Sequence, residues 1–418
     1  MKYYFLFAWR NLWRNRRRTL LATSSIFFAM LIALIYRSLQ SGQHDYMVQM
    51  SVSMYTGHLQ IQGKGYWDER SFDYSFEPTD TLWTLLAQTH HITTINPRIE
   101  SVALISHQTE TRISPVIGIK PETEDAMSGL KKRLVRGNYL TDSSRGVLIA
   151  EGLAERLHVG VGDSVVVFGQ GYEGATVAVQ LPVEGILRFP IPKLNDALLF
   201  LALSNAQEVF NAYNRVTSIV LMVDQAKNVE RIQSALTARI GEQPAETGIP
   251  LIVMDWKEMS PEIVQAIEAD VAGEVIIMFI LYVVIGFGVF GTVMMMTIER
   301  TREFGLLLSL GMKRGRLILL TTVEALLVSV IGAASGIAAA LPLLSYFYTH
   351  PIHLTGDMAR VYLAYGFEPI LPVSVEPAVF TTQTVVVLVL AMIASLYPMF
   401  FLRRIQPVPA LQGRGGAR

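Results

Sequence analysis

The hydrophobic residues of this 418-residue chain are concentrated in four long runs that contain at most one charge each. These runs cover residues 20–36, 275–298, 317–342 and 377–402. Crossing about 30 Å of hydrocarbon takes roughly 20 apolar residues in a helix. The first run is shorter, but the snorkelling side chain of Arg37 extends it. The pattern predicts four transmembrane helices, with bounds at 20–39, 271–298, 317–344 and 377–402.

Residues 40–270 lie between the first two runs. Their apolar residues alternate with polar ones in some segments, as in strands, and recur with helical spacing in others. Helices are expected at 204–210, at 229–240 and at 79–88, where Thr79 or Asp80 is the expected N-cap. Strands are expected at 57–62, 102–119, 164–168, 180–187 and 218–223, and a strand leading into a helix at 147–157. The chain is therefore predicted to be an α-helical membrane protein with an inserted α+β domain.

Basic residues are distributed unevenly between the segments that join the predicted spans. Segments 1–19, 299–316 and 403–418 together hold 15 basic and 2 acidic residues, a net charge of +13. The rest of the chain holds 20 basic and 33 acidic residues, a net charge of −13. Because cytoplasmic segments are enriched in Lys and Arg, we expect both termini and 299–316 in the cytoplasm, and 40–270 and 345–376 outside. No small-residue cleavage site follows Arg37, so the first run is interpreted as an uncleaved anchor.

The chain carries few candidates for chemistry. It has no cysteine, no G-x-x-x-x-G-K-[ST] phosphate loop, no G-x-S-x-G and no H-E-x-x-H motif. The pair His90-His91 lacks a further ligand at helical spacing. The acidic cluster 122–125 follows Pro121 and is interpreted as a solvated helix N-terminus. The net charge of zero gives no support for nucleic-acid binding, and we expect no enzymatic activity, metal or cofactor.

The segment 299–314 is short, amphipathic and basic. Its first residues are mostly charged, and an apolar ridge follows at Phe304, Leu307, Leu308 and Leu310. An apolar ridge exposed between two spans needs a partner surface or lipid headgroups to cover it. Residue chemistry alone leaves a docking helix and a helix lying on the membrane equally open.

Motifs at both ends and in the middle of the chain resemble the FtsX-like, MacB-type permeases of ABC transporters. The segment 299–311 is similar to that family's E-R-x-R-E-[IF]-G-x-L-x-A-x-G signature, with Ser309 where Ala is commoner. The segment 8–19 resembles its opening A-x-R-N-L-x-R-x-x-x-R-T, and the segment 394–411 resembles its ending after Y-P. In the inserted domain, 118–122, 136–140 and 157–163 resemble the periplasmic core of MacB type.

The resemblance implies a permease that works as a dimer, with a second copy or a paralogue, on a separate dimer of ATPase subunits that binds ATP. It also implies the inner membrane as location and a MacB-type periplasmic core as the inserted domain. In this family the loop after the second span is a coupling helix that docks on the ATPase. The coupling residues carried over are Glu299, Arg300, Arg302, Glu303, Phe304, Gly305, Leu307, Leu310 and Gly311.

The third run contains two features that concern helix packing. Glu324 is the one ionisable residue inside the four runs, and an intramembrane carboxylate is costly and normally faces a bundle interior. Pairing with another span and a role in conformational coupling are both open for it. Gly332 and Gly336 form a small-xxx-small face suited to close helix packing.

Three functions within the resembled family stay open. Lipoprotein release of the LolC/LolE type is favoured, because the chain lacks an ATPase domain and has a strand pattern at 57–61 soon after the first span. The alternatives are MacB-type export of a toxin, peptide or antibiotic with an adaptor, and FtsX-like signalling to cell-wall hydrolases, against which the large inserted domain counts. The aromatic residues of the loop 345–376 either anchor it at the membrane interface or contact an acyl chain.

Overall fold

The computed structural model describes residues 2–14, 16–241, 249–364 and 368–404. The chain divides into two compact units. We call them the membrane unit (Met1–Tyr46, Ile267–His353 and Ile370–Arg418) and the sheet unit (Met47–Ala266 and Leu354–Pro369). The tail residues Arg414 and Arg418, and the loop aromatics Tyr365 and Phe367, lie outside the described residues.

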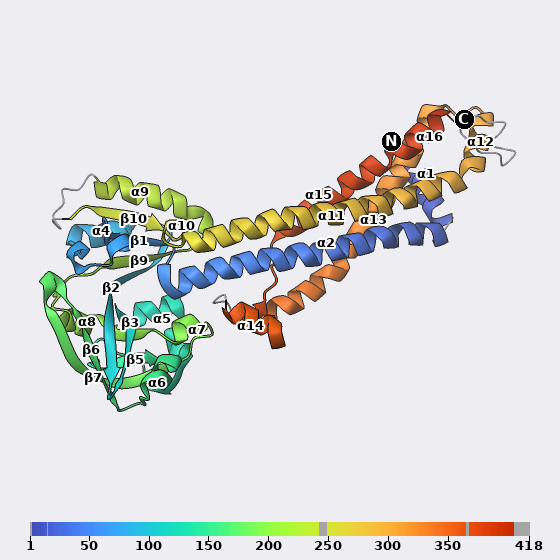
Figure 1. Ribbon diagram of the computed structural model, residues 1–418. Coiled ribbons are helices and arrows are strands. Elements are labelled where there is room, and N and C mark those ends of the chain that lie inside the picture. The colour runs from blue at the N-terminus through green and yellow to red at the C-terminus, as the bar shows by residue number, and fades with distance from the viewer. Residues whose placement is uncertain (1, 15, 242–248, 365–367, 405–418) are drawn as a thin grey trace. The chain divides into compact units, whose positions relative to one another are not determined.

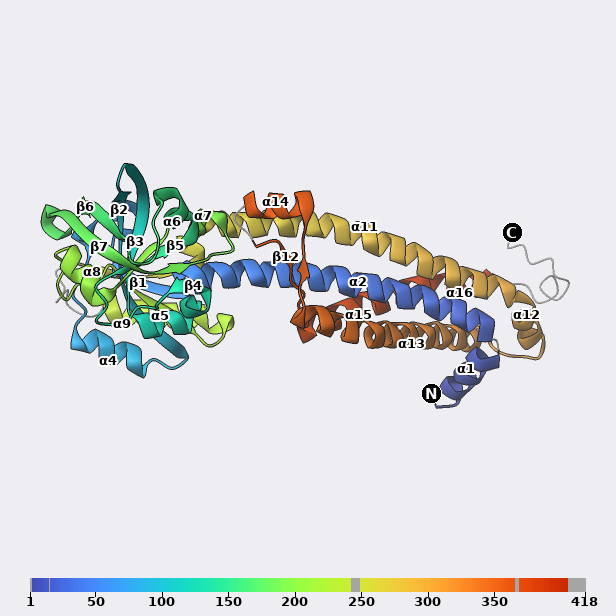
Figure 2. The same cartoon turned by 90° about the horizontal axis from the view of Figure 1, so that it is seen from below.

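Four helical stretches among the described residues are long and apolar enough to cross a membrane. They are α2 (Arg16–Ser51), α11 (Pro261–Glu299), α13 (Arg314–Thr349) and the consecutive pair α15 (Pro377–Ala394) and α16 (Leu396–Arg404). In the membrane unit these helices run side by side in Figures 1 and 2. The four predicted spans are confirmed, and each helix extends beyond the predicted bounds at one or both ends.

Shorter elements lie outside the four spans, and except for the amphipathic helix expected within 299–314 the hydrophobic pattern predicted no regular structure for them. They are α1 (Lys2–Arg14), α12 (Thr301–Ser309), α14 (Gly356–Ala364) and the paired strands β11 (Ile352–His353) and β12 (Ile370–Leu371). The predicted cytoplasmic segment 1–19 is therefore largely helical. The predicted loop 345–376 contains the last turn of α13, a two-stranded ladder and a helix.

The glycine face of α13 packs against α2. A Cβ atom built on Gly332 would lie 2.7 Å from the Cβ of Ile26, and one built on Gly336 would lie 2.8 Å from the Cβ of Met30. Such distances are shorter than any ordinary contact, so only glycine allows this approach of the two helices. The predicted close-packing face is confirmed, and its partner helix belongs to the same chain.

The described residues of the sheet unit contain a ten-stranded mixed sheet, as predicted for an α+β domain. Its order is β10-β1-β9-β2-β3-β8-β5-β7-β4, and β6 pairs with β2 and β7. Most neighbours are antiparallel, whereas the β3/β8 and β5/β7 pairs are parallel. The strands are β1 (Leu59–Gly63), β2 (Ile92–His107), β3 (Glu110–Ile119), β4 (Leu134–Gly137), β5 (Val147–Ala150), β6 (Ser164–Gln170), β7 (Thr176–Leu187), β8 (Leu199–Ala202), β9 (Ser218–Val223) and β10 (Leu251–Asp255).

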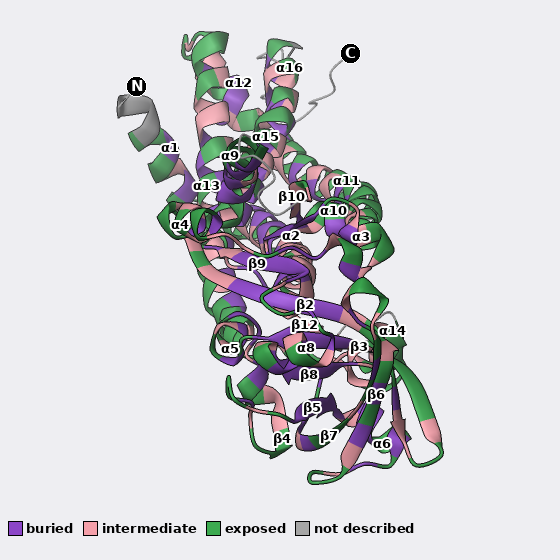
Figure 3. Cartoon of the chain, turned by 90° about the vertical axis from the view of Figure 1, so that its left-hand side faces the viewer, coloured by how far each residue is buried: buried purple, intermediate pink, exposed green. Residues whose placement is uncertain are grey.

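Helices cover this sheet and enclose its apolar cores. They are α3 (Tyr66–Glu69), α4 (Asp80–Gln88), α5 (Pro121–Ser128), α6 (Glu151–Leu157), α7 (Pro192–Asn195), α8 (Leu203–Val209), α9 (Val229–Gly241) and α10 (Trp256–Met259), with a π-helical turn η1 (Val52–Thr56). One cluster gathers around β3, β5 and β8, and a second lies between α4, α9 and the strands β1 and β9. Strands β8 and β9 are accordingly buried along nearly their whole length (Figure 3).

Local sequence patterns predicted several of these elements correctly. The predicted N-cap of α4 is Thr79, whose Oγ1 accepts a hydrogen bond of 3.2 Å from the backbone N–H of Leu82. The predicted strand 102–119 is a hairpin of two strands, because Gln108 adopts a left-handed φ of 52° between β2 and β3. Strands β4, β8 and β10 were not predicted.

Candidate functional site

The predicted coupling helix is α12, a separate helix between α11 and α13. A turn at Leu310 and Gly311 ends it, and Gly311 adopts a positive φ of 90° there. The backbone N–H of Gly311 donates to the carbonyl of Leu308 and that of Met312 to the carbonyl of Leu307, both at 3.1 Å. A glycine just beyond the last helical residue allows this closure because it has no Cβ atom.

The apolar side of α12 is anchored within the chain by Phe304. This side chain is buried against Leu317 of α13 and Leu402 of α16, and Leu307 and Leu308 pack around the same cluster. Gly305 is buried as well. The expectation that Phe304 lies on an exposed ridge is therefore wrong, because two neighbouring helices of the same chain cover it.

The side of α12 that stays exposed carries Arg302, Leu306 and Leu310. A spacing of four residues places these side chains along one edge of the helix. Leu310 is 76% exposed, next to the exposed Ser309 and Gly311. We call Arg302, Leu306 and Leu310 the α12 stripe. It combines apolar surface with a positive charge, which suits docking on a protein partner.

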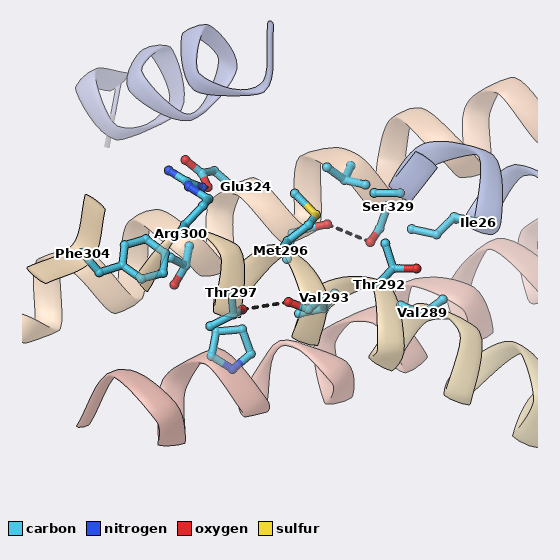
Figure 4. Close-up of a pocket in the computed structure, with 15 residues that line it drawn as sticks. Ile26, Val289, Thr292, Val293, Met296, Thr297, Arg300, Phe304, Glu324 and Ser329 are labelled. Atoms are coloured by element: carbon cyan, nitrogen blue, oxygen red, sulfur yellow. Dashed lines mark hydrogen bonds and ion pairs between the residues drawn. The ribbon is translucent and has the colours of Figure 1, made fainter. Parts of the chain in front are cut away.

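Glu324 lies in a polar cluster that joins α1, α11, α12 and α13. Its Oε2 pairs with Nη1 of Arg300, and its Oε1 accepts a hydrogen bond of 2.5 Å from Nδ2 of Asn11. The Nε of Arg300 is also 3.2 Å from Oε2 of Glu303, which in turn is 3.4 Å from Nη2 of Arg14. Arg300 stacks its guanidinium 5.2 Å from the ring centre of Phe304. Figure 4 shows Arg300 and Glu324 pointing at each other beside Phe304.

Burial is graded along this cluster. The side chain of Glu324 is 4% exposed and that of Arg300 is 11% exposed, whereas Glu303 is 43% exposed. A charge pair removed from water is coupled much more strongly than one at the surface. Arg300 therefore connects a buried carboxylate of α13 to a surface carboxylate of α12. We call Arg300 and Glu324, with Asn11, the Glu324 node.

A small cavity of about 30 Å³ lies beside the Glu324 node. Its polar lining includes the hydroxyls of Thr292, Thr297 and Ser329, which donate to carbonyl oxygens of their own helices at 2.7–2.8 Å. This volume holds about one water molecule. The node is therefore suited to holding helices together.

A second set of polar contacts joins α2 and α11 within the membrane unit. Arg37 pairs with Glu274, which is buried, and Asp270 lies 2.5 Å from Nε2 of Gln40 and 2.6 Å from Nε2 of His44. Glu274 falls inside the predicted span 271–298. The expectation that Glu324 is the one ionisable residue in the spans is therefore wrong, since the apolar run begins one residue after Glu274, a carboxylate that the helix includes.

The sheet unit contains a buried charge cluster that ties η1 to the sheet. Arg98 of β2 forms a bidentate pair with Glu124 of α5, with Nη2–Oε1 at 2.7 Å and Nε–Oε2 at 2.8 Å. Its Nη1 donates to the carbonyl of Tyr55 in η1 at 2.7 Å. Burial acts to lower the pKa of Arg98, but Glu124 and Glu100 outweigh it and raise that pKa. Burial raises the pKa of the Tyr55 hydroxyl, with Glu100 adding to the effect.

This cluster corrects the interpretation of the acidic segment 122–125. That segment does begin a helix, α5, but Glu124 is buried rather than solvated. It points to Arg98, and Asn96 donates a further hydrogen bond of 2.6 Å to its Oε2. The local sequence predicted the helix start correctly, whereas the buried partner is 26 residues away.

Of the adjacent residues His90 and His91, His91 has an unusual backbone conformation and pairs with another residue. His91 has a φ of 75° and places Nδ1 2.8 Å from Oδ2 of Asp224. This hydrogen bond lowers the pKa of Asp224. Among the described residues, no group of three or more His, Asp and Glu side chains is suited to a metal ion.

The site thus brings together Arg300, Glu303 and Phe304 with Glu324, and it leaves Leu310 and Arg302 at the surface. Glu299 ends α11 on the surface. Sequence reasoning missed Asn11, which lies 313 residues from Glu324. The opening motif 8–19 contains Asn11 and was the one signal for it.

The family model of the MacB-like periplasmic core domain matches residues 19–239, and that of the FtsX-like permease C-terminal region matches residues 275–407. The chain is 24% identical to a lipoprotein-releasing system transmembrane protein LolC of Xylella fastidiosa (strain 9a5c), over 76% of each chain. It is 22% identical to the LolC of Neisseria meningitidis serogroup B, over 80% of this chain and 82% of the relative. The crystal structure of the periplasmic region of MacB from Actinobacillus actinomycetemcomitans aligns with a TM-score of 0.36 at 16% identity, covering 52% of this chain and 94% of that one.

Proposed function

Because the chain belongs to the FtsX-like permeases of ABC transporters with a MacB-like periplasmic core domain, we propose that it releases lipoproteins from the inner membrane. The carrying observation is its similarity to LolC proteins over about three quarters of both chains. In this family the ATPase is a separate subunit, so the role of the chain in this proposal is to change conformation in response to ATP binding and hydrolysis by that subunit. Release of a lipid anchor needs mechanical work at the membrane rather than a polar channel, and the small cavity at the Glu324 node agrees with that need.

The proposed contact with the ATPase is the α12 stripe. Leu306 and Leu310 expose apolar surface that a partner would cover, and Arg302 adds a charge beside them. A push on α12 would reach α13 through Arg300 and Glu324, and would reach α1 through Asn11. The buried anchor Phe304 keeps α12 in contact with α13 and α16. Glu299, Glu303, Gly305, Leu307 and Gly311 support this helix in the proposal rather than contacting the partner.

Two further contacts support a transfer of motion toward the sheet unit. Within the membrane unit, the pair Arg37–Glu274 holds α2 against α11. Within the sheet unit, Ser51 at the end of α2 lies 3.3 Å from Ser260 just before α11, hydroxyl to hydroxyl. Arg98 then holds the carbonyl of Tyr55 in η1 against β2. We infer that α2 and α11 move as a pair and that β2 follows them.

The proposed orientation follows from charge. The segments rich in Lys and Arg, including the α12 loop, are placed in the cytoplasm where the ATPase binds ATP. The sheet unit is then periplasmic, where it meets a soluble carrier. The second permease of the complex is either another copy or a paralogue.

The test uses the full chain with its cognate ATPase in proteoliposomes that contain a labelled lipoprotein. Adding ATP and a soluble carrier should move the lipoprotein to the supernatant. The matched control is the same protein without its acyl chains, and an ATPase unable to hydrolyse ATP controls for leakage. Release of the acylated form alone supports the proposal.

Two other results would overturn it. Transport of the unacylated protein, with no release of the acylated form, favours MacB-type export through an adaptor. ATP-dependent activation of a cell-wall hydrolase, with no release of either form, favours FtsX-like signalling.

A further inference from the structure

Helix α1 belongs to the membrane unit, and one of its sides is packed against other helices of that unit. Ala8 and Leu12 are buried in the same apolar cluster as residues of α2 and α13. The hydroxyl of Thr19 in α2 donates a hydrogen bond of 2.7 Å to the carbonyl of Leu12, and Asn11 donates to Glu324. Figures 1 and 2 place α1 at the same end of the membrane unit as α12. The packed side therefore fixes α1 beside α2 and α13.

The opposite side of α1 is exposed and carries an apolar stripe next to a basic one. Leu6, Trp9 and Trp13 are spaced by three and four residues, so they line one edge of this side. Trp13 is 56% exposed, and its ring centre lies 6.0 Å from that of Trp9. Arg10 and Arg14, four residues apart, line the adjoining edge and are both exposed. We call these five residues the α1 surface.

Helix α2 shows at which level of the bilayer this surface lies. Helix α1 ends at Arg14, and α2, a membrane span, begins at Arg16. Leu20 and Leu21 of that span are each 65% exposed, as expected of side chains that face lipid. Arg17 is exposed and precedes them by three and four residues, so it lies on the same side of α2, one turn or about 5 Å nearer the end. Its guanidinium is therefore at the level of the lipid headgroups, and α1 is tied to that level.

The charge of this segment indicates what covers the α1 surface. Residues 1–19 contain six Lys and Arg residues and no Asp or Glu. Within the described part of the chain, no carboxylate pairs with Arg10 or Arg17, whereas Arg14 lies 3.4 Å from Glu303. About four to eight basic residues next to the end of a span attract anionic lipid headgroups, and tryptophan favours the same layer. An anionic bilayer meets both requirements, since its acyl chains cover the rings and its headgroups pair with the arginines.

We propose that the α1 surface binds anionic phospholipids, with Trp9 and Trp13 among the upper acyl-chain carbons and Arg10 and Arg17 against the headgroups. Arginine suits this contact because its guanidinium binds phosphate oxygens bidentately. The bound lipids hold α1 at the Glu324 node. This proposal is independent of the substrate, of the ATPase and of the side of the membrane on which the termini lie.

The test uses the quenching of tryptophan fluorescence by phospholipids that carry bromine on their acyl chains. In the full chain, Trp67, Trp83 and Trp256 of the sheet unit are replaced by phenylalanine, which leaves Trp9 and Trp13 as the two tryptophans. The protein is reconstituted in phosphatidylcholine vesicles that contain a small share of one brominated lipid. Brominated phosphatidylglycerol should quench the two tryptophans more strongly than brominated phosphatidylcholine at the same share.

Arginine variants test the headgroup contact. Arg10→Gln and Arg17→Gln should each lower the preference for phosphatidylglycerol about fivefold, which is the contribution of one basic residue near an anionic surface. The matched control is Arg316→Gln, which removes the same charge from an exposed position in the first turn of α13 and should leave the preference unchanged. Added salt should weaken the preference of the parent chain, because salt screens exposed charges.

Three outcomes overturn the proposal. If neither brominated lipid quenches Trp9 and Trp13, water or protein covers the α1 surface. If both lipids quench equally, the surface contacts lipid without selecting the charge of the headgroup. If Arg316→Gln lowers the preference as much as Arg10→Gln does, the selection comes from the net charge of the chain and not from α1.

A second measurement decides the matter if the phenylalanine variant fails to fold. The chain contains no cysteine, so a spin label in L6C reports on the α1 surface with all five tryptophans in place. In vesicles that contain phosphatidylglycerol, oxygen, which partitions into lipid, should reach this label more often than a neutral, water-soluble nickel chelate does. Adding Arg10→Gln should shift the balance toward the chelate, and a label reached mainly by the chelate in both chains would overturn the proposal.

Discussion

The Glu324 node makes a quantitative prediction about the replacement Glu324→Gln. Glutamine keeps the size of the side chain and an oxygen that can accept the hydrogen bond from Asn11. It removes the negative charge that compensates Arg300. The guanidinium is then left with Glu303, which is 43% exposed and shared with Arg14.

The magnitude follows from burial. Removing one partner of a buried ion pair costs about 3–5 kcal/mol, because the other charge stays buried without compensation. We expect the lower end, about 3 kcal/mol of unfolding free energy, since glutamine keeps the acceptor oxygen for Asn11, although its amide nitrogen cannot accept from Arg300. The matched control is Glu303→Gln, which removes a surface charge from the same arginine and should cost about 0–1 kcal/mol.

The assay is the unfolding free energy of the full chain in micelles of dodecyl maltoside with increasing sodium dodecyl sulfate. A double-mutant cycle with Arg300→Gln isolates each pair. The coupling energy between positions 300 and 324 should be about 2–3 kcal/mol, and that between 300 and 303 below about 1 kcal/mol. ATPase stimulation by the reconstituted permease should fall with Glu324→Gln and change little with Glu303→Gln.

The reasoning is refuted if the two glutamine variants cost the same, or if position 300 couples more strongly to 303 than to 324. Unchanged ATPase stimulation in a destabilised Glu324→Gln variant would keep the structural role and remove the coupling role. The two glutamine variants can be compared directly because each removes one carboxylate partner of the same residue, Arg300.

Three more predictions concern the α12 stripe and the sheet unit. Leu310→Asp should abolish co-purification with the ATPase at unchanged thermal stability, whereas Phe304→Ala should cost about 3–5 kcal/mol of unfolding free energy even without the ATPase. If both variants lost ATPase binding and stability equally, the assignment of Leu310 to binding and of Phe304 to stability would be contradicted. Arg98→Met should lower the unfolding temperature sharply, because it leaves the Glu124 charge buried without its partner. Adding Glu124→Leu should restore most of the unfolding temperature, because apolar groups can replace the whole ion pair. An unfolding temperature that does not recover in the double variant would contradict this prediction. Burial lowers the pKa of His58, whose Nδ1 accepts a hydrogen bond from the N–H of Val223. The unfolded chain therefore binds more protons at this residue than the folded chain, and the free energy of unfolding should fall as the pH drops below about 6.5. His58→Asn should flatten that pH dependence in thermal unfolding of the full chain, and an unchanged slope would assign it to other groups.

The elements that the sequence predicted well are those whose signal is local. Long apolar runs predicted the four spans because hydrocarbon imposes a length on any helix that crosses it. Thr79 was identified as a cap because its hydroxyl bonds a backbone N–H three residues away. Gly332 and Gly336 signalled close packing because their spacing alone brings them to one helix face.

The contacts that the sequence did not predict are those between distant segments. Nothing near Glu124 distinguishes a buried carboxylate from a solvated one, since its partner Arg98 lies on another element. The same holds for Asn11 and Glu324. The ridge of α12 was partly misplaced because amphipathicity shows which side of a helix is apolar and not which neighbour covers it. The strand order, with its two parallel pairs, likewise depends on tertiary packing.

The glycine face of α13 also limits where a second permease can bind. Ile26 and Met30 of α2 already fill the space over Gly332 and Gly336, so that face is not available to another chain. Of the most apolar window of α13, 44% is buried within the chain, whereas the figure for α11 is 17%. Burial of apolar side chains gives no advantage over lipid, so close packing and polar contacts decide which helices associate in a membrane. In this chain α13 already makes those contacts. We therefore expect a second copy to bind at α11, the candidate span with the smallest buried share.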